Sequence, residues 1–350
     1  MFFATRKEIV GIDIGSSSVK LVQLKSHKGV YQLVNAAILP LPPDAIVDNT
    51  MMDRAYIAEA IKKLITTLGI TVRDVACSIS GNSVIIRKII LPTMTSEQLE
   101  EEIIYEAEQY IPFDINDVNL DFQILSHDSI DPLRMNVLLV ASKKELINDY
   151  ISVFNEAGLK LSVVDVASFT IQNAFEINHD SSPEDVLALI NIGASGMNIN
   201  IVKSGISLFT RDVQTGGNLY NEEIQKQLGL SSSEAEAAKL MANASSSKAL
   251  LEVMEKANET ITQEIRRSLE FYNSTANEER TSRIYLSGGC SMAYNLLESI
   301  NDKLDIPVEM ISTFARIKYN DNDFDPKYLE EIGPLMAVGV GLAIRSVGDK

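Results

Sequence analysis

The stretch Val10-Gly-Ile-Asp-Ile-Gly-Ser-Ser-Ser-Val-Lys20, which continues as Leu21-Val-Gln-Leu24, decides the fold that we predict for this chain. Strand-forming residues stand on both sides of a turn of glycine and serine, and this pattern predicts a β-hairpin. Glycine and serine expose backbone N–H groups and hydroxyls without bulk at Cβ, so a phosphate group can approach such a turn and accept several hydrogen bonds. The candidate phosphate-binding residues of the turn are Gly15, Ser16, Ser17 and Ser18.

Two opposite charges flank this turn. Asp13 is placed to hold the water shell of a magnesium ion, and Lys20 to meet the β- or γ-phosphate of a nucleotide as a point charge. Asp13 is therefore a candidate both for catalysis and for metal binding. A tight hairpin whose glycine serves only the turn is the alternative, because short motifs occur by chance.

A second copy of the hairpin pattern lies about half a chain later. Residues 188–201 align with the first hairpin without a gap, so that Asn191 stands on Asp13, Gly193 on Gly15 and Ser195 on Ser17. Two related hairpins imply two similar lobes that face one nucleotide.

Two further glycine turns fit the same site. Residues 284–287 form an apolar strand that leads into Gly288-Gly289, a pair that lets a nucleoside lie against the backbone. Gly216-Gly217-Asn218 precedes a predicted helix, and glycines at a helix N-terminus provide a place for phosphate.

The order of hairpin, inserted segment, Asp165, second hairpin and Gly-Gly turn resembles the actin, Hsp70 and sugar-kinase ATPase superfamily. The resemblance is strongest to its FtsA branch and, within that branch, to the PilM family of type IV pilus assembly proteins. It covers nearly the whole chain and includes residues 164–166, 191–195, 208–213 and 216–218. The resemblance implies an α/β, actin-like two-lobed ATPase fold of duplicated ribonuclease H-like lobes, with an inserted α+β subdomain of the FtsA and PilM type.

The resemblance also implies roles for individual residues. Asp165 stands where the superfamily has its water-positioning carboxylate, with N-capping of the following helix as the alternative. Glu236 and Lys239 resemble the Ala-Glu-x-x-Lys element that reaches ribose and adenine, with a solvated i,i+3 ion pair as the alternative. The expected ligand is ATP with Mg²⁺, and the expected contacts in the second half are Asn191, Gly193, Ala194, Ser195, Gly216, Gly217, Asn218, Glu236, Lys239, Gly288 and Gly289.

Asn191 departs from the superfamily, in which active ATPases usually have aspartate. Asparagine adds no negative charge, so it holds a hydrated cation less well and cannot act as a general base. We therefore expect nucleotide binding with weak ATPase activity at most.

The predicted division of the chain follows these motifs. Residues 1–73 and 164–185 form the first nucleotide-binding lobe, and residues 186–216 and 283–350 the second, with 217–282 as its helical subdomain. Residues 74–163 read as strand, helix, strand, strand and helix, and Thr95 and Gln98 have the spacing of a helix capping box.

In the PilM family, the inserted segment is associated with holding the short cytoplasmic N-terminal tail of the inner-membrane protein PilN. Such a tail can dock along a groove or an exposed strand edge, and residues 84–91 and 99–111 are our candidates for its lining. An ancillary subdomain without a partner is the alternative. Other inner-membrane components of the pilus machine are expected partners, and self-association is left open.

The composition narrows the class of protein. The net charge of −17 argues against a nucleic-acid partner and against direct docking on anionic lipid. Residues 333–344 are too short for a membrane span, and no signal peptide is visible. The two cysteines, Cys77 and Cys290, lack metal spacing, and the three histidines read as surface residues. We therefore expect a cytoplasmic protein that reaches the inner membrane only through its partners.

Two other functions fit the same superfamily. A small-molecule kinase is one, although the inserted segment contains no recognisable acceptor-site carboxylate. A scaffold is the other. It is either an FtsA-like scaffold in division or secretion, or a scaffold that has lost nucleotide binding.

Overall fold

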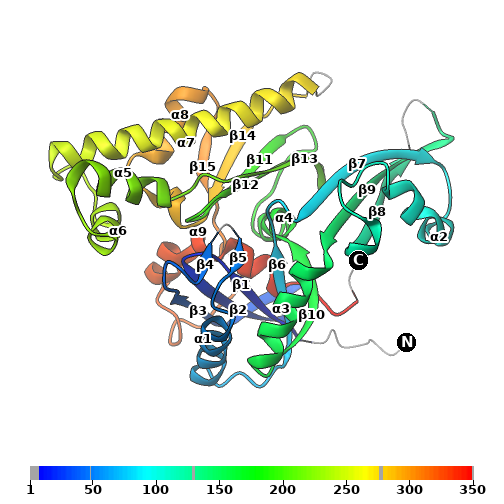
Figure 1. Ribbon diagram of the computed structural model, residues 1–350, viewed down its shortest axis with the longest axis horizontal. Coiled ribbons are helices and arrows are strands. Elements are labelled where there is room, and N and C mark those ends of the chain that lie inside the picture. Colours follow the sequence, from blue (N-terminus) through cyan, green and yellow to red (C-terminus); the bar gives the residue numbers. More distant parts are fainter. Residues whose placement is uncertain (1–7, 48, 128–130, 276–278, 349–350) are drawn as a thin grey trace.

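The computed structural model describes residues 8–47, 49–127, 131–275 and 279–348. Two five-stranded sheets form two lobes, and a three-stranded sheet projects from one side of the molecule (Figure 1). Among these residues, no helix has both the length and the apolarity needed to cross a membrane. The prediction about a signal peptide rests on residues 1–8, of which all but the last lie outside the described part.

The two large sheets have the same topology. Each contains a meander of three antiparallel strands. The first strand of the meander also pairs with a parallel strand, and a second parallel strand pairs with that one. This repeat is the duplication that the two hairpin motifs predict. The first sheet has the order β10 (Lys160–Val166), β6 (Asp74–Ile79), β1 (Val10–Ile14), β2 (Ser18–His27), β3 (Val30–Pro40), and the second has the order β13 (Ile206–Val213), β12 (Met197–Lys203), β11 (Val186–Ile192), β14 (Arg283–Ser287), β15 (Val308–Met310).

Two buried helices, α4 (Ala167–Asn178) and α9 (Pro326–Ala343), lie between the sheets. One hydrophobic cluster joins Ile171 of α4 and Leu342 of α9 to strands of both sheets. A Cβ on Gly341 would overlap the carbonyl oxygen of Thr170, so the two helices cross with their backbones almost in contact. The lobes are therefore joined by a shared core.

The first lobe contains more of the chain than the sequence predicts. Strand β6 pairs with β1 and β10, so residues 74–79 belong to the first sheet and not to the inserted subdomain. Helix α9 packs on β1 and β2, although residues 283–350 were assigned to the second lobe. A helix that is buried on nearly all sides carries no sign in its sequence of which sheet it covers. Residues 144–156, predicted as part of the inserted subdomain, also pack on the first lobe, and the remaining boundaries stay predictions.

The outer face of the first sheet is covered by α1 (Arg54–Thr67) and α3 (Lys144–Glu156). Their apolar faces join one cluster with β1, β2 and β6. A short hairpin of β4 (Ile46–Val47) and β5 (Thr50–Met51) completes this lobe. Since α3 packs on α1 and β10, it too belongs to the first lobe.

The inserted subdomain is an antiparallel sheet in the order β7 (Val84–Pro92), β9 (Arg134–Lys143), β8 (Val118–His127). Helix α2 (Ser96–Ala107) begins with the predicted capping box of Thr95 and Gln98 and packs on this sheet through Leu99 and Ile103. A single-turn 3₁₀ helix, η1 (Ile115–Asp117), precedes β8. The subdomain has a hydrophobic core of its own.

The second lobe carries a group of helices on its outer side (Figure 1). They are α5 (Asn218–Leu228), α6 (Ser232–Leu240), the long α7 (Lys248–Thr275), the 3₁₀ helix η2 (Gly289–Met292) and α8 (Leu296–Leu304). Buried residues on one side of α7, such as Val253 and Ile261, pack on α5 and on the second sheet.

Candidate nucleotide-binding site

The turns of the two hairpins have the same backbone geometry. The N–H of Gly15 donates to the carbonyl of Ser18 at 3.1 Å, and the N–H of Gly193 donates to the carbonyl of Gly196 at 2.8 Å. Four-residue turns closed in this way present free backbone N–H groups at their tips, as phosphate binding requires. The alignment made from the sequence thus holds at the level of single hydrogen bonds.

Asp13 and Lys20 face each other across the first hairpin. They are register partners on β1 and β2, and the distance from Lys20 Nζ to Asp13 Oδ2 is 3.0 Å. The side chains are only 14% and 12% exposed, so solvent screens the pair little. Lys20 Nζ also lies 3.2 Å from the point where a Cβ on Gly15 would stand. The ammonium group therefore sits at the mouth of the turn.

The glycine turn before α5 packs directly on the second hairpin turn. The N–H of Gly217 donates to Gly193 O at 2.9 Å, and the N–H of Asn218 donates to Ala194 O at 2.7 Å. A Cβ on Gly216 would stand 2.5 Å from Gly193 O, so only glycine fits there. The structure thus brings these predicted contact residues together.

Lys239 lies over this turn. Its Nζ is 2.6 Å from Glu236 Oε2 and 3.5 Å from the place that a Cβ on Gly217 would fill. The Lys239 side chain is only 10% exposed, whereas that of Glu236 is 45% exposed, so the lysine end of the pair is shielded from solvent and the glutamate end is not. The ammonium group of Lys239 is thus directed to the glycine turn.

Asn221 is a neighbour that the sequence analysis missed. Its Nδ2 donates to Glu236 Oε2 at 2.6 Å, whereas its buried Oδ1 has no hydrogen-bond partner among the described residues. A buried acceptor without a donor is costly, and a ligand hydroxyl would satisfy it. Only the spacing of Asn218 and Asn221 on one face of α5 could have suggested this residue.

Gly288 closes the second lobe's side of the site. Its φ of +87° is in the left-handed region, and a Cβ would overlap Ile192 O and stand 2.8 Å from Asn191 Oδ1. Gly289 follows as the first residue of η2, beside the buried Cys290. Burial raises the pKa of the Cys290 thiol to about 12, so this cysteine is no nucleophile at neutral pH.

Asp165 is engaged by protein groups. Its Oδ2 accepts a hydrogen bond from Arg345 Nη1 at 2.6 Å, and its Oδ1 accepts one from the N–H of Val166 at 2.7 Å. Burial raises the pKa of the Asp165 carboxyl, while the charge of Arg345 opposes that rise. Asp165 does not cap α4, whose N-cap residue is Val166. Cys77 pairs with Ile12 on β1 and with Val164 on β10, so Asp13 and Asp165 each lie one residue further along a neighbouring strand. Burial, followed by the charges of these two carboxylates, raises the pKa of the Cys77 thiol.

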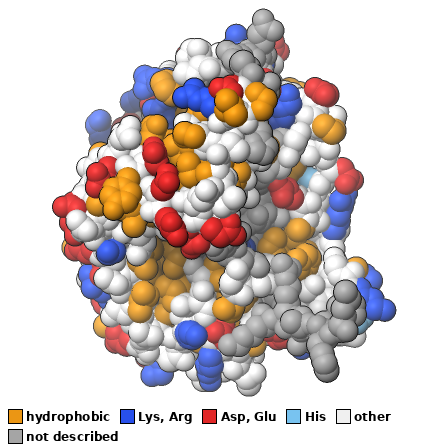
Figure 2. Space-filling view, turned by 90° about the vertical axis from the view of Figure 1, so that its right-hand side faces the viewer, with side chains coloured by type: hydrophobic (Ala, Val, Ile, Leu, Met, Phe, Trp, Pro, Cys, Tyr) orange, Lys and Arg blue, Asp and Glu red, His pale blue; other side chains and the backbone are white. Residues whose placement is uncertain are grey.

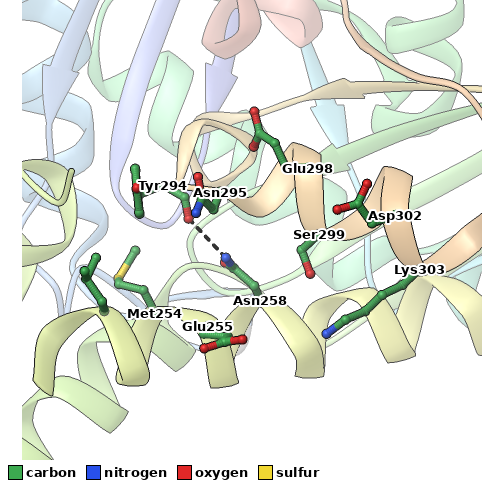
Figure 3. A pocket seen from close by; sticks show the side chains of 10 residues that line it. Met254, Glu255, Asn258, Tyr294, Asn295, Glu298, Ser299, Asp302 and Lys303 are labelled. Atoms are coloured by element: carbon green, nitrogen blue, oxygen red, sulfur yellow. Dashed lines mark hydrogen bonds between the residues drawn. The ribbon is translucent and has the colours of Figure 1, made fainter. Parts of the chain in front are cut away.

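A pocket of about 370 Å³ lies elsewhere, between α7 and α8 (Figure 3). The carboxylates of Glu255, Glu298 and Asp302 and the ammonium group of Lys303 line it, so negative charge is in excess. Lys303 also pairs with Glu259 at 2.9 Å. This lining repels phosphate, and it includes no residue that we predict to contact a nucleotide. The pocket is therefore separate from the phosphate-binding turns.

Residues 11–347 match the family described as type IV pilus assembly protein PilM. The chain belongs to the PilM family. The match confirms the resemblance that the duplicated hairpins, the Gly216-Gly217-Asn218 turn and the inserted segment suggest.

Solved structures agree with this family and with the actin-like fold. The chain resembles the structure described as the PilM-PilN type IV pilus biogenesis complex, with a TM-score of 0.87 and 28% identity over 98% of this chain and 100% of that one. Two more distant structures share the fold. The ethanolamine utilization protein EutJ of Carboxydothermus hydrogenoformans has a TM-score of 0.59 at 15% identity, over 96% and 89% of the two chains. MreB5 of Spiroplasma citri bound to ADP has 0.53 at 12%, over 96% and 94%.

Proposed function

We propose that this PilM-family protein binds ATP with Mg²⁺ between its two lobes, and binds the cytoplasmic N-terminal tail of PilN through its inserted subdomain. The observation that most directly supports nucleotide binding is the repeated turn: residues 15–18 and residues 193–196 are closed by equivalent backbone hydrogen bonds. The structural likeness to a PilM-PilN complex supports the partner.

In the proposed complex, the phosphates lie between the two turns. The N–H groups of Gly15 and Gly193 close the turns. Those of Ser16, Ser17, Ala194 and Ser195 donate to phosphate oxygens, and Lys20 adds a charge-assisted contact. On the second lobe, Gly216 and Gly217 leave room for a ligand against the backbone. Asn221, Glu236 and Lys239 are the side chains suited to a nucleoside, and Gly288 and Gly289 form the opposite wall.

The donor set fits Mg²⁺ bound mainly by water and phosphate. Among the residues that the structure describes, no three His, Cys, Asp or Glu side chains are grouped as a metal cage. Magnesium commonly keeps several waters and takes one or two carboxylates plus substrate phosphates. Asp13, at the first turn, would hold the ion's water shell.

We infer weak hydrolysis from two residues. Asn191 carries no charge and cannot serve as a base. Asp165, the expected water-positioning carboxylate, is already bonded to Arg345 and to the N–H of Val166. Nucleotide binding then serves mainly to favour one arrangement of the lobes. Converting a mostly open population to a mostly closed one requires a preference of about 5.5 kcal/mol, which several phosphate contacts can supply.

The inserted subdomain offers two features for an extended tail. Strand β7 is an edge of its sheet, and an edge strand can pair with a peptide. Helix α2 exposes Ile104 and Tyr105, and the side of the molecule with the inserted subdomain shows hydrophobic and acidic side chains close together (Figure 2). The net charge of −17 favours basic partners and disfavours nucleic acid and anionic lipid. The protein thus reaches the inner membrane through PilN and other pilus components.

Nucleotide binding is tested with Asp13→Asn, which keeps the shape of the side chain and removes its charge. We expect the wild-type protein to bind a fluorescent ATP analogue in Mg²⁺. We expect the variant to bind it about tenfold more weakly, because one charge-assisted interaction is worth a factor of about ten. In EDTA the two proteins should bind similarly weakly.

Asp149→Asn is the matched control, since Asp149 is also a carboxylate in an ion pair, with Arg54 at 2.8 Å on the outer face of the first lobe. It should bind the analogue as the wild type does. No binding by the wild type, or equal affinities of wild type and Asp13→Asn in Mg²⁺, contradicts the nucleotide proposal. Titration with a PilN tail peptide tests the partner separately.

A further inference from the structure

The carboxylate of Asp212 joins the two lobes. Asp212 lies near the end of β13 in the second lobe, and its Oδ2 accepts a hydrogen bond from the backbone N–H of Gly81 in the first lobe. Its Oδ1 accepts a hydrogen bond from Asn198 Nδ2 at 2.7 Å within the second lobe. One side chain thus bonds to both lobes at once.

On the second lobe, this contact continues to the base of the phosphate-binding turn. Asn198 Oδ1 accepts from Asn191 Nδ2 at 3.4 Å, and Asn191 Oδ1 accepts from Ser287 Oγ at 3.3 Å. Asn191 is the predicted contact residue that replaces the usual aspartate. A phosphate bound at residues 193–196 therefore lies next to Asn191, which is linked to Asp212 by two hydrogen bonds through Asn198.

On the first lobe, the contact ends at the root of the inserted subdomain. Gly81 follows β6, and its carbonyl accepts from the N–H of Val84 at 3.0 Å, where β7 begins. The carbonyl of Ser83 accepts from the N–H of Lys143 at 3.1 Å, where β9 ends. The φ of +88° at Gly81 and the close side chain of Asn49 fix the direction of its N–H. Asp212 therefore holds the point at which the inserted subdomain is attached.

The hairpin itself does not need this carboxylate. In the second sheet, Asn198 pairs with Asp212, whereas in the first sheet the equivalent Lys20 pairs with Ile38. An apolar residue thus serves the same register position of the same hairpin in the other lobe. What Asp212 adds is the contact across the lobes.

We propose that Asp212 is a latch between the lobes that makes nucleotide binding and partner binding cooperative. This inference rests on the proposed function, because it assigns a coupling to the same two sites. Contacts of phosphate with the second turn stabilise the lobe arrangement in which Asp212 reaches Gly81, and this bond fixes the root of the subdomain that holds the tail peptide. By linkage, the peptide must strengthen nucleotide binding by the same factor.

The test compares the affinity of a PilN tail peptide with and without saturating ATP and Mg²⁺. We expect ATP to strengthen peptide binding by the wild-type protein by about fivefold or more. In Asp212→Ala, the peptide should bind without nucleotide within about threefold of the wild type, and ATP should bring no further gain. Asp180→Ala is the matched control, because Asp180 is an exposed carboxylate paired with Arg316; it should keep the full gain.

The outcomes separate the two proposals. A gain in Asp212→Ala as large as in the wild type overturns the latch and leaves the proposed function intact, and so does a wild type that binds both ligands independently. No ATP binding by the wild type overturns the proposed function and the latch with it. If Asp212→Ala does not fold, hydrogen exchange of the Gly81 amide in the wild type decides: the latch predicts slower exchange with ATP, and an unchanged rate overturns it.

Discussion

The two hairpins differ most at the residues that face each other below each turn. The first hairpin has the ion pair of Asp13 and Lys20, and the second has the amides of Asn191 and Asn198. A nucleotide bound as we propose would meet an ion pair below the first turn and neutral amides below the second. The two hairpins have the same backbone geometry, but only the first places charged side chains below its turn.

His179 provides a test at the scale of one residue. The sequence suggested a surface histidine, but its ring stacks on Phe175 at 4.7 Å, and its Nε2 accepts from the N–H of Ser312 at 3.1 Å. Burial, followed by the charge of Arg316, lowers the pKa of His179 below its ordinary value of 6.5. The unfolded chain then binds a proton at a higher pH than the folded protein does.

His179 therefore stabilises the fold fully above its ordinary pKa, and this contribution is lost as the pH falls from there through the folded-state pKa. Between about pH 7.5 and about pH 5.5, the free energy of unfolding in urea should fall in both proteins. We expect a smaller fall in His179→Gln than in the wild type. His27→Gln, at an exposed position in β2, is the control and should keep the wild-type drop. Equal drops in all three proteins would show that His179 does not contribute.

The candidate site was predictable where residue type alone limits the backbone. The glycines of the three turns were predicted because no other residue allows such close approach, as at Gly216. The partners that depend on tertiary structure were missed. Arg345 reaches Asp165 from the far end of the chain, and Gly81 reaches Asp212 through a backbone N–H that has no signature in the sequence.

The crossing of α4 and α9 is the element on which the joining of the lobes depends. Gly341→Ala would place a methyl group onto the carbonyl oxygen of Thr170. Because two helix backbones would have to separate in a shared core, we expect the free energy of unfolding to fall by about 3 kcal/mol. Chemical denaturation followed by circular dichroism measures this change.

Gly333→Ala is the control within α9. A Cβ at Gly333 meets no atom within 4 Å apart from its chain neighbours, and it lies away from the crossing. Alanine gains helix propensity there, but the ring of Pro334 disfavours a helical residue with a Cβ before it, so we expect a net change of no more than about 1 kcal/mol. A similar loss in both variants would mean that the helix, and not the crossing, is sensitive.

Element types were predicted better than element placement. The hairpins and the capped α2 follow from turn residues and local spacing. The predictions of the sheet to which β6 belongs and of the lobe on which α9 packs were wrong. Both placements depend on neighbours far away in the sequence. Apolar runs that are buried on two sides lack the periodicity that would reveal an orientation.

At the scale of the whole molecule, the cores predict two levels of stability. The large lobes share a cluster across α4 and α9, whereas the inserted subdomain has a separate core. We expect amides of β9 to exchange through an opening that costs at least about 2 kcal/mol less than global unfolding, while amides of β11 require global unfolding. Native-state hydrogen exchange with mass spectrometry measures both.

A PilN tail peptide should slow exchange in β7 to β9 and leave β14 unchanged, which makes β14 the internal control. Equal opening free energies for β9 and β11 would contradict the separate core. Slowing of all strands alike would mean that the peptide stabilises the molecule as one unit.

The root of the inserted subdomain has one more consequence. The chain leaves the first lobe at Ser83 and returns at Lys143, and these residues are joined by a backbone hydrogen bond of 3.1 Å. The two ends of the inserted subdomain thus lie side by side, and the subdomain is attached to the first lobe at a single point. A module of another length can replace it without any change in the strand order of the two large lobes.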